Sequence, residues 1–168
     1  RWKDAPAGDV LAAARRVVEL ARGRALVIVN DRADLALLSG ADGVHVGDED
    51  LPVAEARRLL GRELLVGRTC RTFDEARRAV ADGADHVGFG PMFETRSKEV
   101  GVPPRPIEAL EEVAAGLGAP VVAISGITLE NIGRIAATGA AWVNPGCRNR
   151  MYRGGSWASA PATRTCLP

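Results

Sequence analysis

Short apolar runs alternate with longer amphipathic segments along most of the chain. Residues 9–21 carry apolar side chains at helical spacing, and residues 25–29 form a continuous apolar run typical of a buried strand. The same pattern predicts further strands at residues 43–46, 64–66, 87–89, 121–124 and 142–143, and further helices at residues 33–39, 52–60, 73–82, 106–117 and 128–137. Strands that alternate with helices predict a parallel sheet with right-handed crossovers.

A short repeat marks the start of several predicted strands. Gly-Ala-Asp occurs at residues 40–42 and 83–85, and Gly-Ala-Ala at residues 139–141, each just before a strand. This indicates internal repetition of a strand–helix unit. No Gly-x-Gly-x-x-Gly motif follows the first strand, and there is no Walker-type lysine motif. The pattern therefore favours a (β/α) barrel over an open doubly wound sheet.

Polar residues collect where the predicted strands end. Asn30 and Asp31 follow one strand, Asp50 follows the next, and later strands end near Thr69 and Gly126. In a barrel these residues share one rim, where two carboxylates and a phosphorylated ligand could hold Mg²⁺. The structural alternative is that Asp31 and Asp50 each cap the helix that follows.

The segment from Gly88 to Gly101 leaves its strand at Gly90-Pro91 and then places Thr95, Ser97 and Lys98 on an irregular loop. Hydroxyls, cations and backbone N–H groups at the end of a buried strand suit an anion. The alternative is an ordinary solvated connection that is basic.

Histidine and cysteine offer little further chemistry. His45 lies inside a predicted strand and is expected to be packed or structurally hydrogen-bonded, and His86 opens a strand without a visible partner. Cys70 has no neighbouring histidine to activate it, so we expect an inert thiol.

Composition limits the class of protein. With 168 residues, 22 basic and 21 acidic, the chain fits one domain and gives no reason to expect nucleic acid as a partner. No apolar run is long enough for a membrane span, and no signal segment is visible at the start. Three widely spaced cysteines fit a reducing cytoplasm. We expect a domain at residues 1–143 and a basic, irregular, poorly ordered tail at residues 144–168.

Five motifs together resemble thiamine-phosphate synthase and its TenI relatives. They are Arg1-x-Lys3, Asn30-Asp31-Arg32, GADGVHVGDEDLP, GFGPMFETRSK and the segment from Val122 to Thr128. The resemblance runs from Arg1 to about Gly139. It implies a (β/α)₈ TIM barrel and a transferase of thiamine biosynthesis. That enzyme joins 4-amino-2-methyl-5-hydroxymethylpyrimidine diphosphate to thiazole phosphate and releases pyrophosphate.

The resemblance also implies roles for individual residues. Asp31 and Asp50 would hold Mg²⁺. The diphosphate would be held by Arg1, Lys3, Asn30, Thr69 and Lys98, of which Asn30, Thr69 and Lys98 would be catalytic. The thiazole phosphate would be held by Thr95, Ser97 and the Gly126 backbone. Diphosphate would leave before the thiazole nitrogen attacks, so the reacting carbon needs no general base.

The chain departs from the family pattern at several positions. Asp48 stands where a glutamine is usual, Arg71 replaces a common histidine, and Ser125 replaces a glycine. The family's first strand is missing, and its last strand and closing helix are not matched by residues 142–146. We therefore expect an incomplete barrel with two exposed edges.

Two other functions stay open. One is a TenI-like thiazole tautomerase, which the combination of Arg1-x-Lys3 with Asp31 and Asp50 disfavours because an isomerase needs no diphosphate site. The other is a degenerate barrel without catalysis, favoured by the broken ends. A homo-oligomer, in which a second copy completes the barrel, also stays open.

Overall fold

A computed structural model describes residues 5–21, 24–94, 102–144 and 152–153 of the chain. The strands are β1 (Ile28–Asn30), β2 (Gly43–Val46), β3 (Leu65–Cys70), β4 (His86–Phe89), β5 (Val121–Ile124), β6 (Trp142–Asn144) and β7 (Tyr152–Arg153). The helices are α1 (Ala7–Ala21), α2 (Ala33–Ser39), α3 (Val53–Leu60), α4 (Phe73–Ala81), α5 (Ile107–Gly116) and α6 (Ile132–Ala136). The predicted alternation of strands and helices is confirmed.

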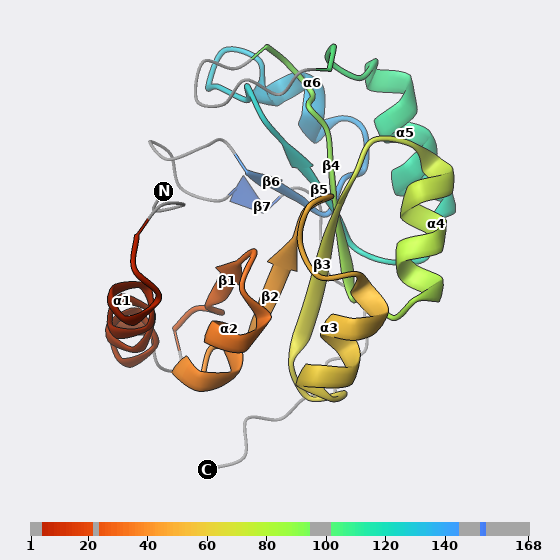
Figure 1. The fold of residues 1–168 in the computed structure, drawn as a ribbon. Helices are drawn as coiled ribbons and strands as arrows, with labels where there is room; N and C mark the ends of the chain where they lie inside the picture. The colour runs from red at the N-terminus through yellow and green to blue at the C-terminus, as the bar shows by residue number, and fades with distance from the viewer. Residues whose placement is uncertain (1–4, 22–23, 95–101, 145–151, 154–168) are drawn as a thin grey trace.

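The strands lie in the sheet in the same order as in the sequence, from β1 to β7. Each strand from β1 to β6 is parallel to the next. A doubly wound sheet would reverse its strand order part-way, whereas sequential right-handed crossovers keep all helices on one side. Figure 1 shows the helices around the outside of the strands, as in a (β/α) barrel. Among the described residues β1 pairs only with β2, so this part of the sheet is open.

The face of the sheet below the helices forms the core. Val29, Val44 and Val66 are neighbours in the parallel register, and all three are buried. Successive residues of a strand point to opposite faces, so this row faces the helices while its sequence neighbours face the interior of the curved sheet. The helices complete the core with small and branched side chains, including Leu35, Ala56, Ala76, Leu110 and Ile135.

Glycines make room for two imidazoles on the opposite, inner face. Gly67 lies in register between His45 and His86. A Cβ atom on Gly67 would lie 2.1 Å from His86 Nε2 and 2.5 Å from His45 Nδ1. The two rings therefore occupy the space that a side chain at position 67 would need.

The two Gly-Ala-Asp segments link the beginnings of β2 and β4 to the preceding part of the sheet. The Asp42 carboxylate accepts a hydrogen bond from Val27 N at 2.6 Å, while Asp42 N donates to Val27 O at 2.9 Å. Asp85 repeats both contacts with Val66, at 2.8 and 2.7 Å. Arg57 adds an ion pair to Asp85 and donates to Gly83 O at 2.8 Å. The repeat is thus a recurring link between neighbouring strands.

Some predicted boundaries were wrong. Strand β3 runs on to Cys70, so Thr69 lies inside the strand rather than after it. Helix α6 begins at Ile132, not at Thr128, because residues 126–131 form a turn held by the Asn131 side chain. The start of α4 is confirmed, since the Thr72 hydroxyl accepts a hydrogen bond from Glu75 N at 3.2 Å.

The described part of the predicted tail is short. It consists of Asn144, the last residue of β6, and of β7, which pairs with β6 in antiparallel fashion. The other residues of the 144–168 segment lie outside the described ranges, so the expectation of an irregular tail stays a prediction. No helix in the described ranges is long and apolar enough to cross a bilayer.

Candidate active site at the ends of the strands

Asp31 lies directly after β1, at the edge shared with β2. Its backbone N–H donates to His45 O at 2.8 Å, which brings the turn against the neighbouring strand. The residue has a left-handed φ of 67°, uncommon for a side chain other than glycine. The Asn30 amide donates to the Asp31 carboxylate and so orients it. Asp31 is held by this turn and does not cap α2, whose N-cap is Arg32.

Asp50 occupies the corresponding place after β2. One of its carboxylate oxygens accepts a hydrogen bond from Gly47 N at 2.6 Å, which closes a tight loop over residues 47–50. Helix α3 has Pro52 as its N-cap and no side-chain cap. The alternative that Asp31 and Asp50 are helix caps is therefore wrong for both. Because β1 and β2 are adjacent and parallel, both carboxylates follow the same edge of the sheet.

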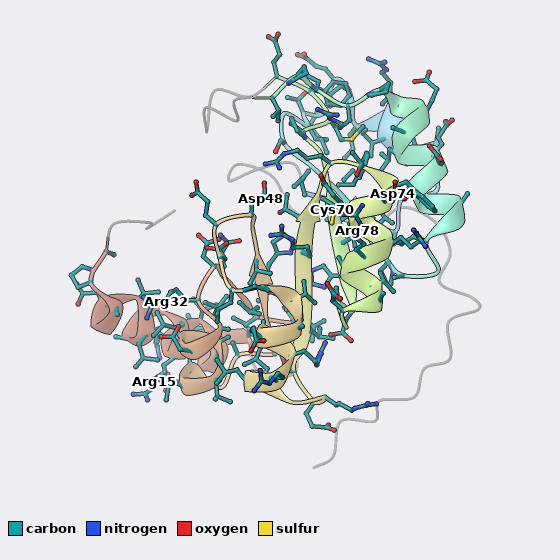
Figure 2. The ribbon with its side chains drawn as sticks, turned by 45° about the vertical axis from the view of Figure 1, so that its right-hand side comes forward. Arg15, Arg32, Asp48, Cys70, Asp74 and Arg78 are labelled. Carbon is teal, nitrogen blue, oxygen red and sulfur yellow. The ribbon has the colours of Figure 1, made fainter. Side chains whose placement is uncertain are left out.

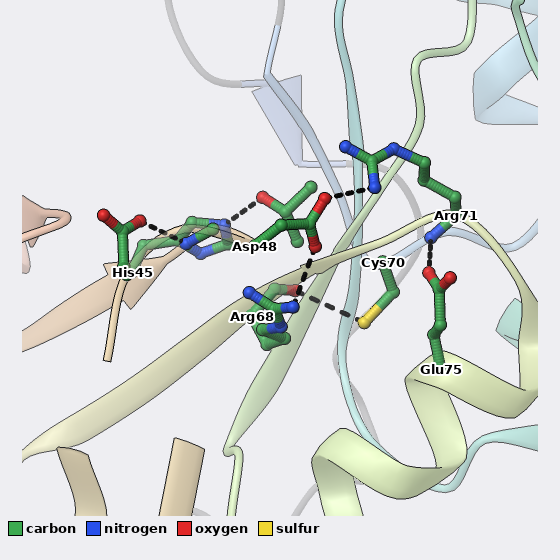
Figure 3. A network of polar contacts seen from close by, with 9 residues as sticks. His45, Asp48, Arg68, Cys70, Arg71 and Glu75 are labelled. Atoms are coloured by element: carbon green, nitrogen blue, oxygen red, sulfur yellow. Dashed lines mark hydrogen bonds and ion pairs between the residues drawn. The ribbon is translucent and has the colours of Figure 1, made fainter. Parts of the chain in front are cut away.

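Asp48 is paired with two arginines, as Figure 3 shows. Arg68 reaches it from β3 with an N–O distance of 2.8 Å, and Arg71 reaches its other oxygen from the end of the same strand. The backbone N–H of Arg71 donates to the Glu75 carboxylate at 2.6 Å, which fixes the start of α4. The two guanidinium groups offset the negative charge that Asp48 brings to the rim.

Thr69 lies on the inner face next to the histidine pair. Its hydroxyl is 2.9 Å from His45 Nε2, and His45 Nδ1 is 3.3 Å from His86 Nε2. Burial, together with the neighbouring His86, lowers the pKa of His45 to about 4, although Asp31 acts in the opposite direction. Burial also lowers the pKa of His86. The expectation of a structurally bonded His45 is confirmed, whereas the expectation that His86 lacks a partner was wrong.

The turn after β5 places Gly126 close to the loop that follows β4. Ser125 and Gly126 have left-handed φ values of 72° and 69°. A Cβ atom on Gly126 would lie 2.5 Å from the carbonyl oxygens of both Phe93 and Glu94. Only glycine fits such an approach together with this φ. The structure thus places the backbone of residue 126 beside the beginning of the predicted anion loop.

Cys70 is the last residue of β3 and is buried (Figure 2). Burial raises the pKa of its thiol to about 12. Such a thiol is not ionised at neutral pH, and this supports the expectation that Cys70 is inert.

A cavity of about 280 Å³ opens beside the rim, between the loop before α3 and helix α4. Asp48, Asp50 and Arg68 line it, together with Glu75, Arg78 and Asp82 from α4. Asp50 thus borders both the rim and this cavity. Among the predicted site residues that the structure describes, only Asp50 lines this cavity.

Five of the predicted site residues lie outside the described ranges. They are Arg1, Lys3, Thr95, Ser97 and Lys98. Of the other five, Asn30 is the last residue of β1 and Thr69 lies on β3, while Asp31, Asp50 and Gly126 follow β1, β2 and β5. The structure thus brings these five to the same end of a parallel sheet.

A metal at this rim would have two protein carboxylates. Within the described residues no group of three or more histidine, cysteine, aspartate or glutamate side chains is arranged to hold a metal. Two oxygen donors without sulfur or imidazole suit Mg²⁺, which commonly takes its other ligands from water and phosphate. The donor set thus fits Mg²⁺ and does not fit a structural zinc site.

Comparison with known proteins identifies the family. The family model described as thiamine monophosphate synthase matches residues 1–144. The chain belongs to the thiamine monophosphate synthase family. A thiamine-phosphate synthase from Anaeromyxobacter dehalogenans is 68% identical over 141 residues, covering 84% of this chain and 64% of that protein. One from Myxococcus xanthus is 54% identical over 116 residues, or 69% of this chain and 53% of the relative.

The fold has a counterpart in the same family. A thiamine phosphate pyrophosphorylase from Pyrococcus furiosus superposes with a TM-score of 0.75 at 33% identity, covering 82% of this chain and 66% of the other. These family members are longer than the matched part of this chain, which spans 64% of the Anaeromyxobacter relative. The predicted fold class and the predicted family are both confirmed.

The sequence alone did not indicate the ion pairs between residues of the rim. Arg68 was not singled out, and Asp48 and Arg71 were noted separately although they form an ion pair. Their spacing of 23 residues gives no local signal. Asp48 follows β2 and Arg71 follows β3. Because these strands are consecutive, their matching positions could have indicated the contact.

Proposed function

We propose that this chain is a thiamine-phosphate synthase that requires Mg²⁺. It would join 4-amino-2-methyl-5-hydroxymethylpyrimidine diphosphate to thiazole phosphate with release of pyrophosphate. Membership of the family supports the reaction. The observation that carries the proposal is the pair of carboxylates, Asp31 and Asp50, held after adjacent parallel strands by Asn30 and by Gly47 N.

The two carboxylates would hold the metal. Mg²⁺ bound there would offset the charge of the departing diphosphate. The role of this chain's own residues is to orient the oxygen ligands before the substrate arrives. The Asn30 amide and the Gly47 N–H do so from one side of each carboxylate. Such preorganisation lowers the cost of reaching the transition state.

The remaining contacts would be divided between the two substrates. Thr69 presents a hydroxyl at the diphosphate side, and its position is fixed by His45 at 2.9 Å. The Gly126 backbone would contact the thiazole phosphate. Arg1, Lys3 and Lys98 would add cations to the diphosphate, and Thr95 and Ser97 would add hydroxyls to the thiazole phosphate. These five stay predictions, since they lie outside the described ranges.

The histidine and the cysteine near this rim are poor proton acceptors or nucleophiles at neutral pH. The pKa of His45 is lowered to about 4, mainly by burial, and that of the Cys70 thiol is raised to about 12. A reaction in which the diphosphate leaves before the thiazole nitrogen attacks needs charge neutralisation and alignment rather than a general base. These environments support that mechanism.

Two alternatives remain as outcomes of experiment. A thiazole tautomerase would bind no diphosphate, so it would show no heat with magnesium pyrophosphate. A degenerate barrel would be folded and would form no product. We also propose that the protein works in the cytoplasm on small phosphorylated substrates. A second copy of the chain completing the sheet beside β1 stays a proposal.

The decisive experiment measures product from both substrates with Mg²⁺ in the wild type and in Asp50→Asn. Asparagine keeps an oxygen for Gly47 N, so the loop should stay folded while the charge is lost. Loss of a metal–phosphate contact should lower kcat/KM by about 100-fold or more. The matched control is Glu49→Gln, an exposed neighbour that should stay within about threefold of the wild type. An unchanged rate in Asp50→Asn would remove Asp50 from this role.

A further inference from the structure

The turn between β5 and α6 is held by one side chain that the resemblance does not assign. Asn131 Nδ2 donates to Gly126 O at 3.0 Å, and Asn131 Oδ1 accepts from Thr128 N at 2.8 Å. Both ends of the Asn131 amide therefore bind backbone of the same turn. A helix N-cap would use only the oxygen, and the structure shows no side-chain cap at α6.

The bond to Gly126 O determines where the next N–H group points. The peptide between Gly126 and Ile127 is trans, because the cis bond of the described chain is Gly90-Pro91. In a trans peptide the N–H and the C=O point in opposite directions. Since Asn131 holds the Gly126 carbonyl on its own side, the Ile127 N–H points away from Asn131.

The preceding peptide is held from the other side. Ser125 O accepts a hydrogen bond from Phe93 N at 3.2 Å, so the Gly126 N–H points away from the Phe93 N–H. Neither Gly126 N–H nor Ile127 N–H donates to another residue that the structure describes. Two consecutive backbone N–H groups in a turn with left-handed residues are the kind of donor pair that binds an anion.

We propose that Asn131 is a positioning residue for the phosphate of the thiazole substrate. It acts through the Gly126–Ile127 peptide, which it holds with both amide hydrogens of residues 126 and 127 available to phosphate oxygens. The inference rests on the proposed function for the identity of the substrate. Beyond that function, the inference assigns a role to Asn131, which does not itself touch the substrate. It also gives the direction in which the backbone N–H groups of residues 126 and 127 point.

The chain offers a variant that separates the two bonds of Asn131. Asn131→Asp keeps an oxygen for Thr128 N but replaces the donor to Gly126 O with a second oxygen, which repels the carbonyl. Asn131→Ala removes both bonds without adding charge. Leu129→Asp is the matched control, because it adds the same charge at an exposed position of the same turn.

The first measurement is binding of inorganic phosphate, followed through the amide resonances of the full-length chain by NMR. We expect phosphate to shift the Gly126 and Ile127 signals in the wild type. Asn131→Asp and Asn131→Ala should bind phosphate about tenfold more weakly, the loss expected for one positioned hydrogen bond. Leu129→Asp should stay within about threefold of the wild type. Equal phosphate affinity in all four proteins, or no shift at these two amides, would overturn the inference.

The second measurement is steady-state kinetics with both substrates. We expect Asn131→Asp to raise KM for the thiazole phosphate by about tenfold, with kcat and KM for the pyrimidine diphosphate within about threefold. A loss shared equally by both substrates would indicate a merely structural role and overturn the assignment. If the wild type forms no product but its phosphate binding still depends on Asn131, the proposed reaction fails and the positioning role stands.

Discussion

Four aspartates at the two ends of the sheet show how the same side chain serves different purposes. Asp42 and Asp85 lie where strands begin. Asp42 bonds both the N–H and the carbonyl of Val27, just before β1, and Asp85 bonds those of Val66 on β3. Asp31 and Asp50 lie where strands end; the Asn30 side-chain amide orients the first and the Gly47 backbone N–H orients the second. The first pair links strands, whereas the second pair presents oxygens at a rim.

The difference follows from the direction of parallel strands. At the beginning of a strand the neighbouring backbone still has N–H groups that need an acceptor, and a carboxylate satisfies one. At the end of a strand the chain turns towards a helix, so a side chain there is free of sheet pairing and can serve a ligand. Substitutions at the two ends should therefore separate activity from stability.

The largest effect is expected for the rim. Asp31→Asn should lower kcat/KM by about 100-fold or more, because the metal would lose one of its two anionic ligands. The midpoint of thermal unfolding should change little, since asparagine still accepts a bond from Asn30. Kinetics and thermal melts on the same samples give both readouts. A melting point that falls in parallel with activity would place Asp31 among the structural aspartates.

At the beginning of the strands, a substitution is expected to lower stability and to leave activity unchanged. Asp85→Ala should lower the free energy of unfolding by about 3 kcal/mol, because Val66 N loses its acceptor and the mostly buried Arg57 loses its anion. Urea unfolding measures the change. Asp42→Ala is the matched comparison: it loses the same backbone bond without an arginine, and should cost about 1 kcal/mol. Equal costs for both would show that Arg57 contributes nothing, and reduced activity in the folded Asp85 variant would contradict the separation of the two ends.

A third change tests the interior between the two ends. Gly67→Ala should destabilise the protein by about 2 kcal/mol, because its Cβ would collide with both imidazoles and displace their hydrogen bonds. Gly133→Ala in α6 is the control, since no atom lies within 4 Å of its added Cβ. There we expect a gain of up to about 1 kcal/mol from helix propensity. Urea unfolding of both variants measures the two changes in free energy. An unchanged stability of Gly67→Ala would mean that the imidazole rings can move aside.

The smallest effect concerns pH. The pKa of His45 is lowered to about 4 in the folded protein, so the unfolded chain binds its proton first as the pH falls. The contribution of neutral, buried His45 to stability is fully present at pH values above the ordinary histidine pKa of about 6.5. It is lost as the pH falls from that value to about 4.

Comparison with His45→Gln isolates this contribution from that of the carboxylates. Between pH 7 and pH 5 the wild type should lose roughly 1–2 kcal/mol more of its unfolding free energy than the variant. Urea unfolding at the two pH values gives the measurement. Parallel losses in both proteins would show that His45 is not buried as neutral imidazole.

Particular elements show how far prediction from sequence could go. The alternation of strands and helices predicted a parallel sheet, and this is confirmed from β1 to β6. Local pattern was insufficient for the start of α6. The segment from Thr128 looks helical in its residues, but the Asn131 side chain holds it as a turn.

The candidate site divides in a similar way. Asp31 and Asp50 could be predicted because a polar residue after an apolar run is visible in the sequence. The Asp48 pair with Arg68 and Arg71, and the contact of His45 with His86, could not. Each joins residues more than 19 positions apart, and only the register of neighbouring strands decides that they meet.

The sequence by itself determined the alternation of strands and helices, the family and the carboxylates at the strand ends, because all of these depend on local spacing and residue type. The tertiary structure decided which charges are offset, which glycines leave no room for a side chain and which partners hold the turn after β5. Those properties depend on side chains brought together from different strands, and their packing and hydrogen-bond geometry exist only in the folded chain.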